Sequence, residues 1–246
     1  MKKDILLKFI NTKVGYGNPK GDFWFIGPEE GGSINANEDR IKVWNELGEN
    51  ECFQDMKDFH LSLCCMNENY KRDLERFFTG DKIKLQQTWN GIIEILFGLT
   101  SVDGSIEKKR IYQSTLLGSK NGNTVIGELF PFSSKKLNDE NSFQYFGMSK
   151  KEYWDEYSNL RQNLLIDQIN TYRPKIVVFY STAFVDYWIQ IIKTLDKKFD
   201  QLQSISDLHL SYHKSTNIVF VIIPHPVSRL LNHKKRRVGE AILNLI

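Results

Sequence analysis

Two adjacent carboxylates, Glu29 and Glu30, follow the apolar run 23–26 and are bounded by glycines. A carboxylate held on a tight turn can act as a general base or stabilise a developing positive charge. Gly27 would let a ligand approach the backbone closely. The segment contains neither Gly-x-Gly-x-x-Gly nor Gly-Lys-Ser/Thr, so we expect no nucleotide cofactor. A solvated surface turn remains the alternative interpretation, and the residue types do not decide which carboxylate is catalytic.

A second candidate, His225, lies between two prolines after the apolar run 217–223. Each proline fixes its own φ and lacks an N–H group, so the loop is stiff and the imidazole is pre-positioned. An ordinary turn histidine is the alternative interpretation. The stretch after it combines a hydroxyl, two leucines and basic side chains, a pattern that fits contacts with DNA. Its members are Ser228, Arg229, Leu230, Leu231, Lys234, Lys235, Arg236 and Arg237.

Two aromatic residues, Phe130 and Phe132, flank a proline after the apolar run 124–129. Their rings can stack on a planar ligand such as a base, with packing in the core as the alternative.

The elements that must position these residues are apolar strands separated by helices. Strands are expected at 23–26, 124–130, 175–180 and 217–223, and helices at 37–47, 55–65, 70–79, 84–98, 150–172, 182–195 and 234–245. Apolar strands in which polar residues do not alternate are typical of a sheet that is covered on both faces. Strands that alternate with helices along the chain are typical of parallel βαβ units. We therefore expect an α/β fold, a three-layer α/β/α sandwich with a central, mainly parallel sheet. Ligands bind at the carboxyl ends of such strands, where the three candidate segments lie.

Composition narrows the remaining choices. With 26% charged and 41% hydrophobic residues, the 246-residue chain is not a disordered protein. No apolar stretch is long enough to span a membrane, and Lys8 interrupts the first apolar run too early for a signal peptide, so we expect a cytoplasmic protein. The three cysteines form no Cys-x-x-Cys pair, which indicates a reduced protein without a metal site. We expect a monomeric single domain over 1–246, with a helical insertion at roughly 48–122 that covers the site.

Together the three segments resemble the uracil-DNA glycosylase superfamily, whose fold is an α/β/α sandwich. Gly27-Pro28-Glu29-Glu30-Gly31 takes the place of the first motif of the family, and His225-Pro226-Val227-Ser228 the place of the last. Leu129-Phe130-Pro131 is similar to the middle segment, which in the family lies near the bound base. The asparagine that usually reads uracil is not evident on the strand at 175–180. The expected substrate is therefore a modified or bulkier base rather than uracil.

The resemblance implies cleavage of the bond between a base and its deoxyribose, leaving an abasic site, without a metal or cofactor. Glu29 or Glu30 would stabilise the oxocarbenium-like sugar or activate water, and His225 would donate a hydrogen bond to the departing base. Phe130 or Phe132 would stack on that base, and Ser228 would hold a neighbouring phosphate.

DNA is the expected partner, and its target nucleotide must leave the helix. Leu230 and Leu231 would fill the gap, and the basic residues 234–237 would bind flanking phosphates. Two alternatives stay open: a catalytically silent nucleic-acid-binding protein of the same fold, and a nucleoside hydrolase. A role in repair or in defence against foreign modified DNA would follow from the substrate.

Overall fold

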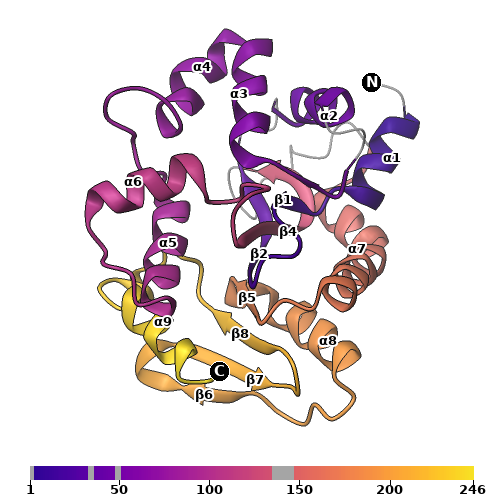
Figure 1. Ribbon diagram of the computed structural model, residues 1–246. Coiled ribbons are helices and arrows are strands. Elements are labelled where there is room, and N and C mark those ends of the chain that lie inside the picture. The colour runs from indigo at the N-terminus through magenta and orange to yellow at the C-terminus, as the bar shows by residue number, and fades with distance from the viewer. Residues whose placement is uncertain (1–2, 33–35, 48–50, 135–146) are drawn as a thin grey trace.

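The computed structural model describes residues 3–32, 36–47, 51–134 and 147–246. Residues 33–35, which follow the first motif, and 48–50, where the predicted insertion begins, lie outside the described part. The chain has an α/β fold, in which helices flank both faces of an eight-stranded, mostly parallel sheet (Figure 1). This confirms the α/β class and is compatible with three layers.

The sheet has the order β3-β1-β4-β2-β5-β8-β7-β6. Its strands are β1 Gly15–Gly17, β2 Phe23–Gly31, β3 Phe53–Gln54, β4 Thr124–Ser134, β5 Ile176–Tyr180, β6 Gln203–Ile205, β7 Leu210–Lys214 and β8 Val219–Ile223. The four parallel strands β4, β2, β5 and β8 form the centre and correspond to the apolar runs. The other four, which the sequence did not predict, extend the sheet to either side.

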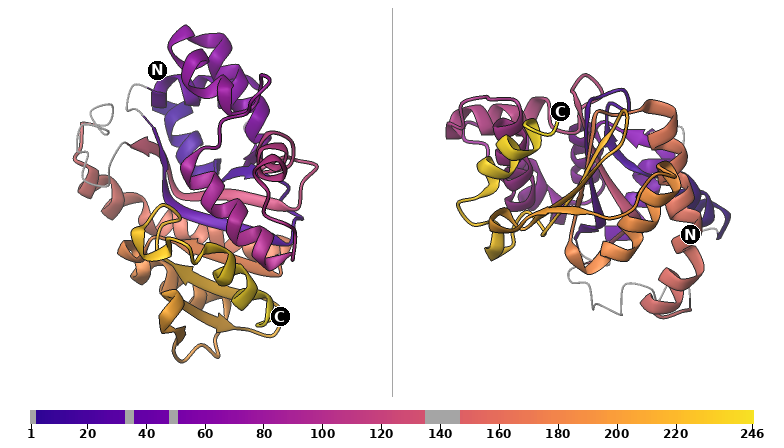
Figure 2. Two further views of the ribbon diagram at one scale, coloured as in Figure 1. Left: turned by 90° about the vertical axis from the view of Figure 1, so that its left-hand side faces the viewer. Right: turned by 90° about the horizontal axis from the view of Figure 1, so that it is seen from below.

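One group of helices covers each face of the sheet, and Figure 2 shows the sheet between these two groups. One face carries α1 Lys3–Thr12, α7 Lys150–Tyr172 and α8 Val185–Leu195; the other carries α5 Gln87–Leu99, α6 Ile106–Thr115 and α9 Lys235–Leu243. Beyond one end of the sheet lie α2 Ala36–Leu47, α3 Met56–Met66 and α4 Glu68–Leu74. Short 3-10 helices follow at η1 Glu75–Phe77, η3 Thr182–Phe184, η4 Ser206–Leu208 and η5 Arg229–Leu231. The helix predicted at 70–79 is thus divided between α4 and η1, and α1 and α6 were not predicted.

Two central strands continue through the prolines that were expected to end them. β2 pairs with β5 only as far as Ile26, and beyond Pro28 it has β4 alone as a neighbour. β4 pairs with β1 only as far as Gly127, so Pro131 also lies where one side of the strand has no partner. Proline is tolerated in such edge positions because no ladder hydrogen bond is required of its nitrogen. Glu29 and Glu30 therefore lie on a strand and not on a turn.

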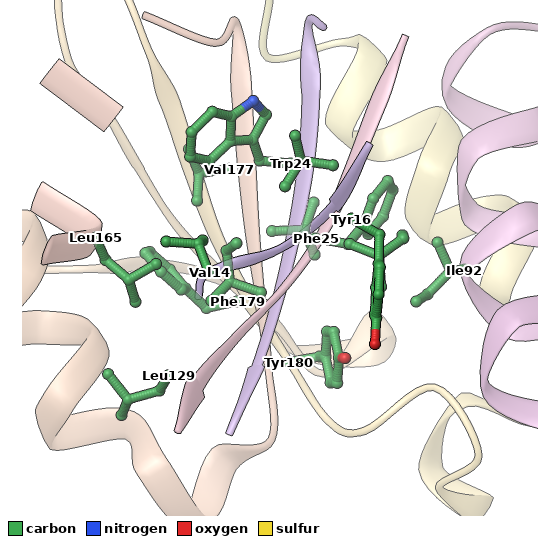
Figure 3. Packing of buried hydrophobic residues seen from close by; sticks show 14 of the residues in the cluster. Val14, Tyr16, Trp24, Phe25, Ile92, Leu129, Leu165, Val177, Phe179 and Tyr180 are labelled. Carbon is green, nitrogen blue, oxygen red and sulfur yellow. The ribbon is translucent and has the colours of Figure 1, made fainter. Parts of the chain in front are cut away.

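The core fills both sides of the sheet. Figure 3 shows Leu165 of α7 on one side of the strands and Ile92 of α5 on the other, and both side chains are fully buried. Arg161 of α7 is also buried, and its guanidinium donates to the carbonyls of Ile10, Glu128 and Leu129. This fastens α7 and α1 to the strand that carries Glu128. None of the helices in the described residues is long and apolar enough to cross a membrane.

Candidate active site

A cavity of about 630 Å³ opens at the carboxyl ends of the central strands. The central strand that follows β2 in the chain, β4, lies on one side of the β2–β5 pair, and β8, which follows β5, lies on the other side. The strand order therefore reverses between β2 and β5. Open α/β sheets bind ligands at such a switch point, beyond the carboxyl ends of the strands. The walls include Tyr16, Glu29, Glu30, Arg40, His60, Arg76, Phe77, Gln86, Thr88, Trp89, Glu128, Tyr180, Ser181 and His225.

Strand geometry separates the two adjacent carboxylates. Successive side chains of a strand point to opposite faces, so Glu29 turns toward α7 and Glu30 toward α2 and α3. The Glu29 side chain is 4% exposed and that of Glu30 is 18% exposed. Both border the cavity, but Glu30 is the carboxylate that a ligand can reach.

Glu30 is surrounded by donors. Tyr16 donates from its hydroxyl at 2.9 Å, Arg40 forms an ion pair with the same oxygen, and His60 Nε2 lies 3.3 Å from Oε1. Burial would raise the pKa of Glu30, but the Arg40 guanidinium and His60 hold that pKa well below its usual range. Glu30 is therefore a permanent anion and a weak base.

His60 has an acceptor on each ring nitrogen. Its Nδ1 lies 2.7 Å from the carbonyl of Met56, and its Nε2 faces the Glu30 carboxylate. The ring is therefore held between these two oxygens. With Arg40 and Tyr16, His60 fixes the position of the Glu30 carboxylate in the cavity wall.

Glu29 makes a structural ion pair. Lys150 Nζ and Ser134 Oγ each donate to its Oε2 at 2.6 Å, and the Trp154 indole donates to Oε1 at 3.0 Å. The Lys150 side chain is 4% exposed, so the pair is buried on both sides. These contacts tie the start of α7 to the ends of β2 and β4, and they occupy both oxygens of Glu29.

A third carboxyl group, Glu128, lies on β4 and was not among the predicted site residues. Tyr180 donates to its Oε1 at 3.0 Å. The Tyr180 ring reaches it by crossing over Gly27, where a Cβ atom would lie 2.3 Å from a ring carbon. The absence of a side chain at Gly27 therefore makes room for Tyr180, a different use of this glycine from the predicted approach by a ligand.

His225 lies at the cavity wall, and its ring packs edge-on against Tyr180 with centroids 5.4 Å apart. The backbone N–H of Val227 donates to its Nδ1 at 3.3 Å. Burial lowers the pKa of His225 below its ordinary value, so the ring is neutral at pH 7. A neutral imidazole whose Nδ1 accepts carries its proton on Nε2. His225 thus has an N–H donor to offer a ligand, and the rigid loop predicted from the prolines positions it.

The segment between α2 and β4 builds the outer wall of the cavity. This segment places the aromatic ring of Trp89 and the polar side chains of Arg76, Gln86 and Thr88 in the wall. The helix α5 is fixed by close approach to α9: a Cβ on Gly98 would lie 2.1 Å from the Arg236 carbonyl oxygen. The predicted insertion therefore forms part of the candidate site.

The structure places three predicted site residues in the core. Phe130 is fully buried and packs against Tyr153 and Trp154, and Phe132 is 2% exposed. Neither ring lines the cavity, so the predicted stacking role does not fit their positions. Leu231 is also fully buried, whereas Leu230 is 51% exposed. Of the two leucines proposed to fill a gap in DNA, only Leu230 is accessible.

The basic stretch after His225 is partly engaged within the protein. Lys234 donates to the Asp207 carbonyl, Arg237 pairs with the Asp207 carboxylate, and Arg236 pairs with Glu240. Within the described residues, Arg229 and Lys235 make no ion pair. Ser228 accepts from the N–H of Leu230 and caps η5, so its hydroxyl starts the turn that exposes Leu230.

The residues that sequence analysis missed are those brought to the site by other elements. Tyr16, Arg40, His60 and Tyr180 come from four different elements, and nothing in their local sequence distinguishes them. Glu128 did carry a signal, since it is an acidic residue inside an otherwise apolar strand. Ser181, which precedes η3 at the cavity wall, has φ 94°, a strained conformation of the kind found at functional sites.

The fold and the cavity define an α/β protein with a ligand pocket at the switch point of its sheet, lined by carboxyl, imidazole and guanidinium groups. No known protein-family model matches the chain, and no curated protein shows significant sequence similarity to it. Within the described residues, no three His, Cys, Asp or Glu side chains are grouped so as to hold a metal ion.

Proposed function

We propose that the protein is a DNA glycosylase with a uracil-DNA-glycosylase-like arrangement, which releases a flipped-out, modified base. The observation that carries the proposal is that His225 and Glu30 both line one cavity at the carboxyl ends of the strands. One supplies a neutral N–H donor and the other a permanent negative charge. Breaking an N-glycosidic bond requires both, because negative charge develops on the base and positive charge on the sugar.

The low pKa of Glu30 selects between the two roles that a carboxylate could have. A carboxylate held well below its usual pKa accepts a proton poorly, so it is ill suited to activate water. A fixed negative charge beside the sugar stabilises an oxocarbenium-like transition state without any proton transfer. Glu30 therefore acts electrostatically, and Arg40, Tyr16 and His60 hold it in position.

His225 acts on the base that leaves. Its Nε2–H donates a hydrogen bond to an oxygen or nitrogen of the base, where negative charge accumulates as the bond breaks. This division of roles requires no metal ion or organic cofactor.

The size and lining of the cavity favour a base with a substituent. At about 630 Å³, the cavity is in the range of pockets that enclose drug-sized ligands, well above the needs of an unmodified pyrimidine. Its outer wall carries Arg76, Gln86, Thr88 and Trp89, a mixture of hydrogen-bonding and aromatic groups. Such a wall suits a polar substituent on the base better than a methyl group.

A DNA partner is supported by the surface that follows His225. Leu230 is exposed two residues after Ser228, where a side chain could fill the space of an extruded nucleotide. Arg229 and the basic residues 234–237 lie on the same short stretch and would bind flanking phosphates.

Release of a base is tested directly with a panel of DNAs: unmodified, uracil-containing, and phage DNAs that carry modified bases. Alkali converts each abasic site to a strand break. We expect breaks on one modified DNA, and their loss in H225A and E30Q. Cleavage of free nucleosides but not of DNA would replace the proposal with a nucleoside hydrolase. Salt-dependent DNA binding without breaks on any substrate would replace it with a silent binding protein.

A further inference from the structure

Among the described residues that line the cavity, Arg40 and Glu128 each have a buried polar atom without a hydrogen-bond partner, Nε and Oε2 respectively, and only that of Glu128 is an oxygen. Glu128 is 7% exposed, its Oε1 accepts from the Tyr180 hydroxyl, and its Oε2 makes no hydrogen bond to any described residue. Buried polar atoms in native proteins nearly always have a partner, because leaving one without costs free energy. Since Glu128 lines the cavity, a bound ligand can supply the missing partner.

The groups that face Glu128 favour its neutral form. Burial acts most strongly, the Glu30 and Glu29 carboxylates of β2 act in the same direction, and together they raise the pKa of Glu128 well above its usual range. Arg40 of α2 and the hydrogen bond from Tyr180 of β5 oppose this shift without cancelling it. Glu128 is thus a carboxylic acid in a site that also contains an ionised carboxylate, Glu30.

The contact with Tyr180 fixes which oxygen carries the proton. Burial and Glu128 raise the pKa of Tyr180 well above its usual value, so its hydroxyl keeps its hydrogen and donates it. Glu128 Oε1 is therefore the carbonyl oxygen of the acid, and the proton is on Oε2, the atom without a partner.

We propose that Glu128 is a specificity-determining residue, whose Oε2–H donates a hydrogen bond to a carbonyl oxygen or an unprotonated ring nitrogen on the edge of the bound base. This inference rests on the proposed function, since it takes the ligand of the cavity to be a base. A base that turned an amino group toward Oε2 would place a donor against a donor and would bind less well.

The protonation state is measured first, without any ligand. The protein is labelled with ¹³C at the glutamate side-chain carboxyls, and E128Q identifies the Glu128 signal by its disappearance. We expect the Glu128 signal at the position of a neutral acid at pH 7, with movement only at higher pH. A Glu128 signal at the ionised position at pH 7 would overturn the proposal.

Binding of free cytosine, 5-hydroxymethylcytosine, uracil and adenine, each at millimolar concentration, is then measured by isothermal titration calorimetry. At least one base should bind, and E128L should weaken that binding by roughly tenfold, the effect of one lost hydrogen bond. E128Q, whose amide is also a donor, should bind the base almost as tightly as the wild type. Binding by the wild type should weaken at high pH as Glu128 ionises, and binding by E128Q should not. Thermal unfolding checks that both variants fold.

Equal binding by the wild type and E128L, or no binding by any base, would overturn the inference. The strand-break assay remains a separate measurement. Glu128-dependent binding of a base without release from DNA would reject the glycosylase and keep Glu128 as the residue that reads the base.

Discussion

At the scale of the residue, the site contains three glutamates whose surroundings give each of them a different state. Glu29 is neutralised by a buried lysine, Glu30 is kept ionised by Arg40 and His60, and Glu128 is kept protonated by burial. Two of them are neighbours in sequence and differ only in the face of the strand from which they project. A fixed anion and a neutral acid in one cavity can contact a sugar cation and a base at the same time.

Substitution of the two adjacent glutamates should separate their roles. E30Q removes the fixed charge and should lower the rate of base release about 100-fold or more. E29Q leaves the buried Lys150 without a counter-charge and should reduce the free energy of unfolding by about 3 kcal/mol. Urea unfolding and single-turnover kinetics at a temperature where both variants are folded measure the two effects. A larger kinetic loss in E29Q than in E30Q would contradict the assignment.

The raised pKa of Glu128 makes the stability of the protein depend on pH. The folded state keeps this proton after the unfolded chain has lost it, so the wild type loses stability as pH rises above the usual glutamate range. E128Q cannot ionise, and its stability relative to the wild type should rise by up to about 1.4 kcal/mol per pH unit until the folded pKa is reached. Urea unfolding from about pH 5, just above the usual pKa of glutamate, to about pH 8 tests this. A constant difference across these values would contradict the expected titration.

At the scale of the element, the site is closed by α5, and glycines decide how close α5 lies to its neighbours. A Cβ on Gly98 or Gly239 would lie 2.1 Å or 1.9 Å from a backbone oxygen of the facing helix. A Cβ on Gly91 would lie 2.8 Å from Pro226, next to His225. The helix that carries Trp89 into the cavity is thus in contact with the histidine loop and with α9.

Adding one methyl group between these helices should loosen the outer wall. We expect G98A and G239A each to destabilise the fold by roughly 1–3 kcal/mol, because backbone atoms on both sides must move apart. G104A is the matched control, since its added Cβ would meet only the end of the Arg236 side chain, at 3.3 Å. Chemical denaturation of the three variants is the measurement. Wild-type stability in G239A would show that the helices can separate without cost.

At the scale of the whole molecule, charge is distributed unevenly along the chain. Residues 201–246 contain six Lys or Arg and two acidic residues, whereas the whole chain contains 33 and 30. The basic excess therefore lies in the part of the chain that includes His225. If the protein binds DNA as proposed, this part of the chain is where we expect the phosphates to bind.

DNA binding should reflect that asymmetry. R229E should weaken the binding of a DNA duplex. It should also make the logarithm of the affinity less steeply dependent on salt, by roughly one phosphate contact. The control K20E changes the same charge at an exposed position before β2, near the opposite end of the sheet. Fluorescence anisotropy over a series of salt concentrations measures both variants. Equal losses in R229E and K20E would indicate attraction by net charge alone.

The sequence by itself determined the four central strands, the long helix α7 and the place of the histidine loop. These follow from local causes: continuous apolar runs, the capping box of Ser149 and Glu152, and two prolines around His225. The strands β1, β3 and β6 were missed because they have only two or three residues each, too few to show a pattern. The tertiary structure alone decided that β2 and β4 continue past their prolines. Proline is acceptable there because β5 no longer pairs with β2, and β1 no longer pairs with β4, at those positions. It also decided which carboxyl group is ionised, since Arg40, His60 and Tyr180 come from distant parts of the chain and the pKa of a buried acid depends on what surrounds it.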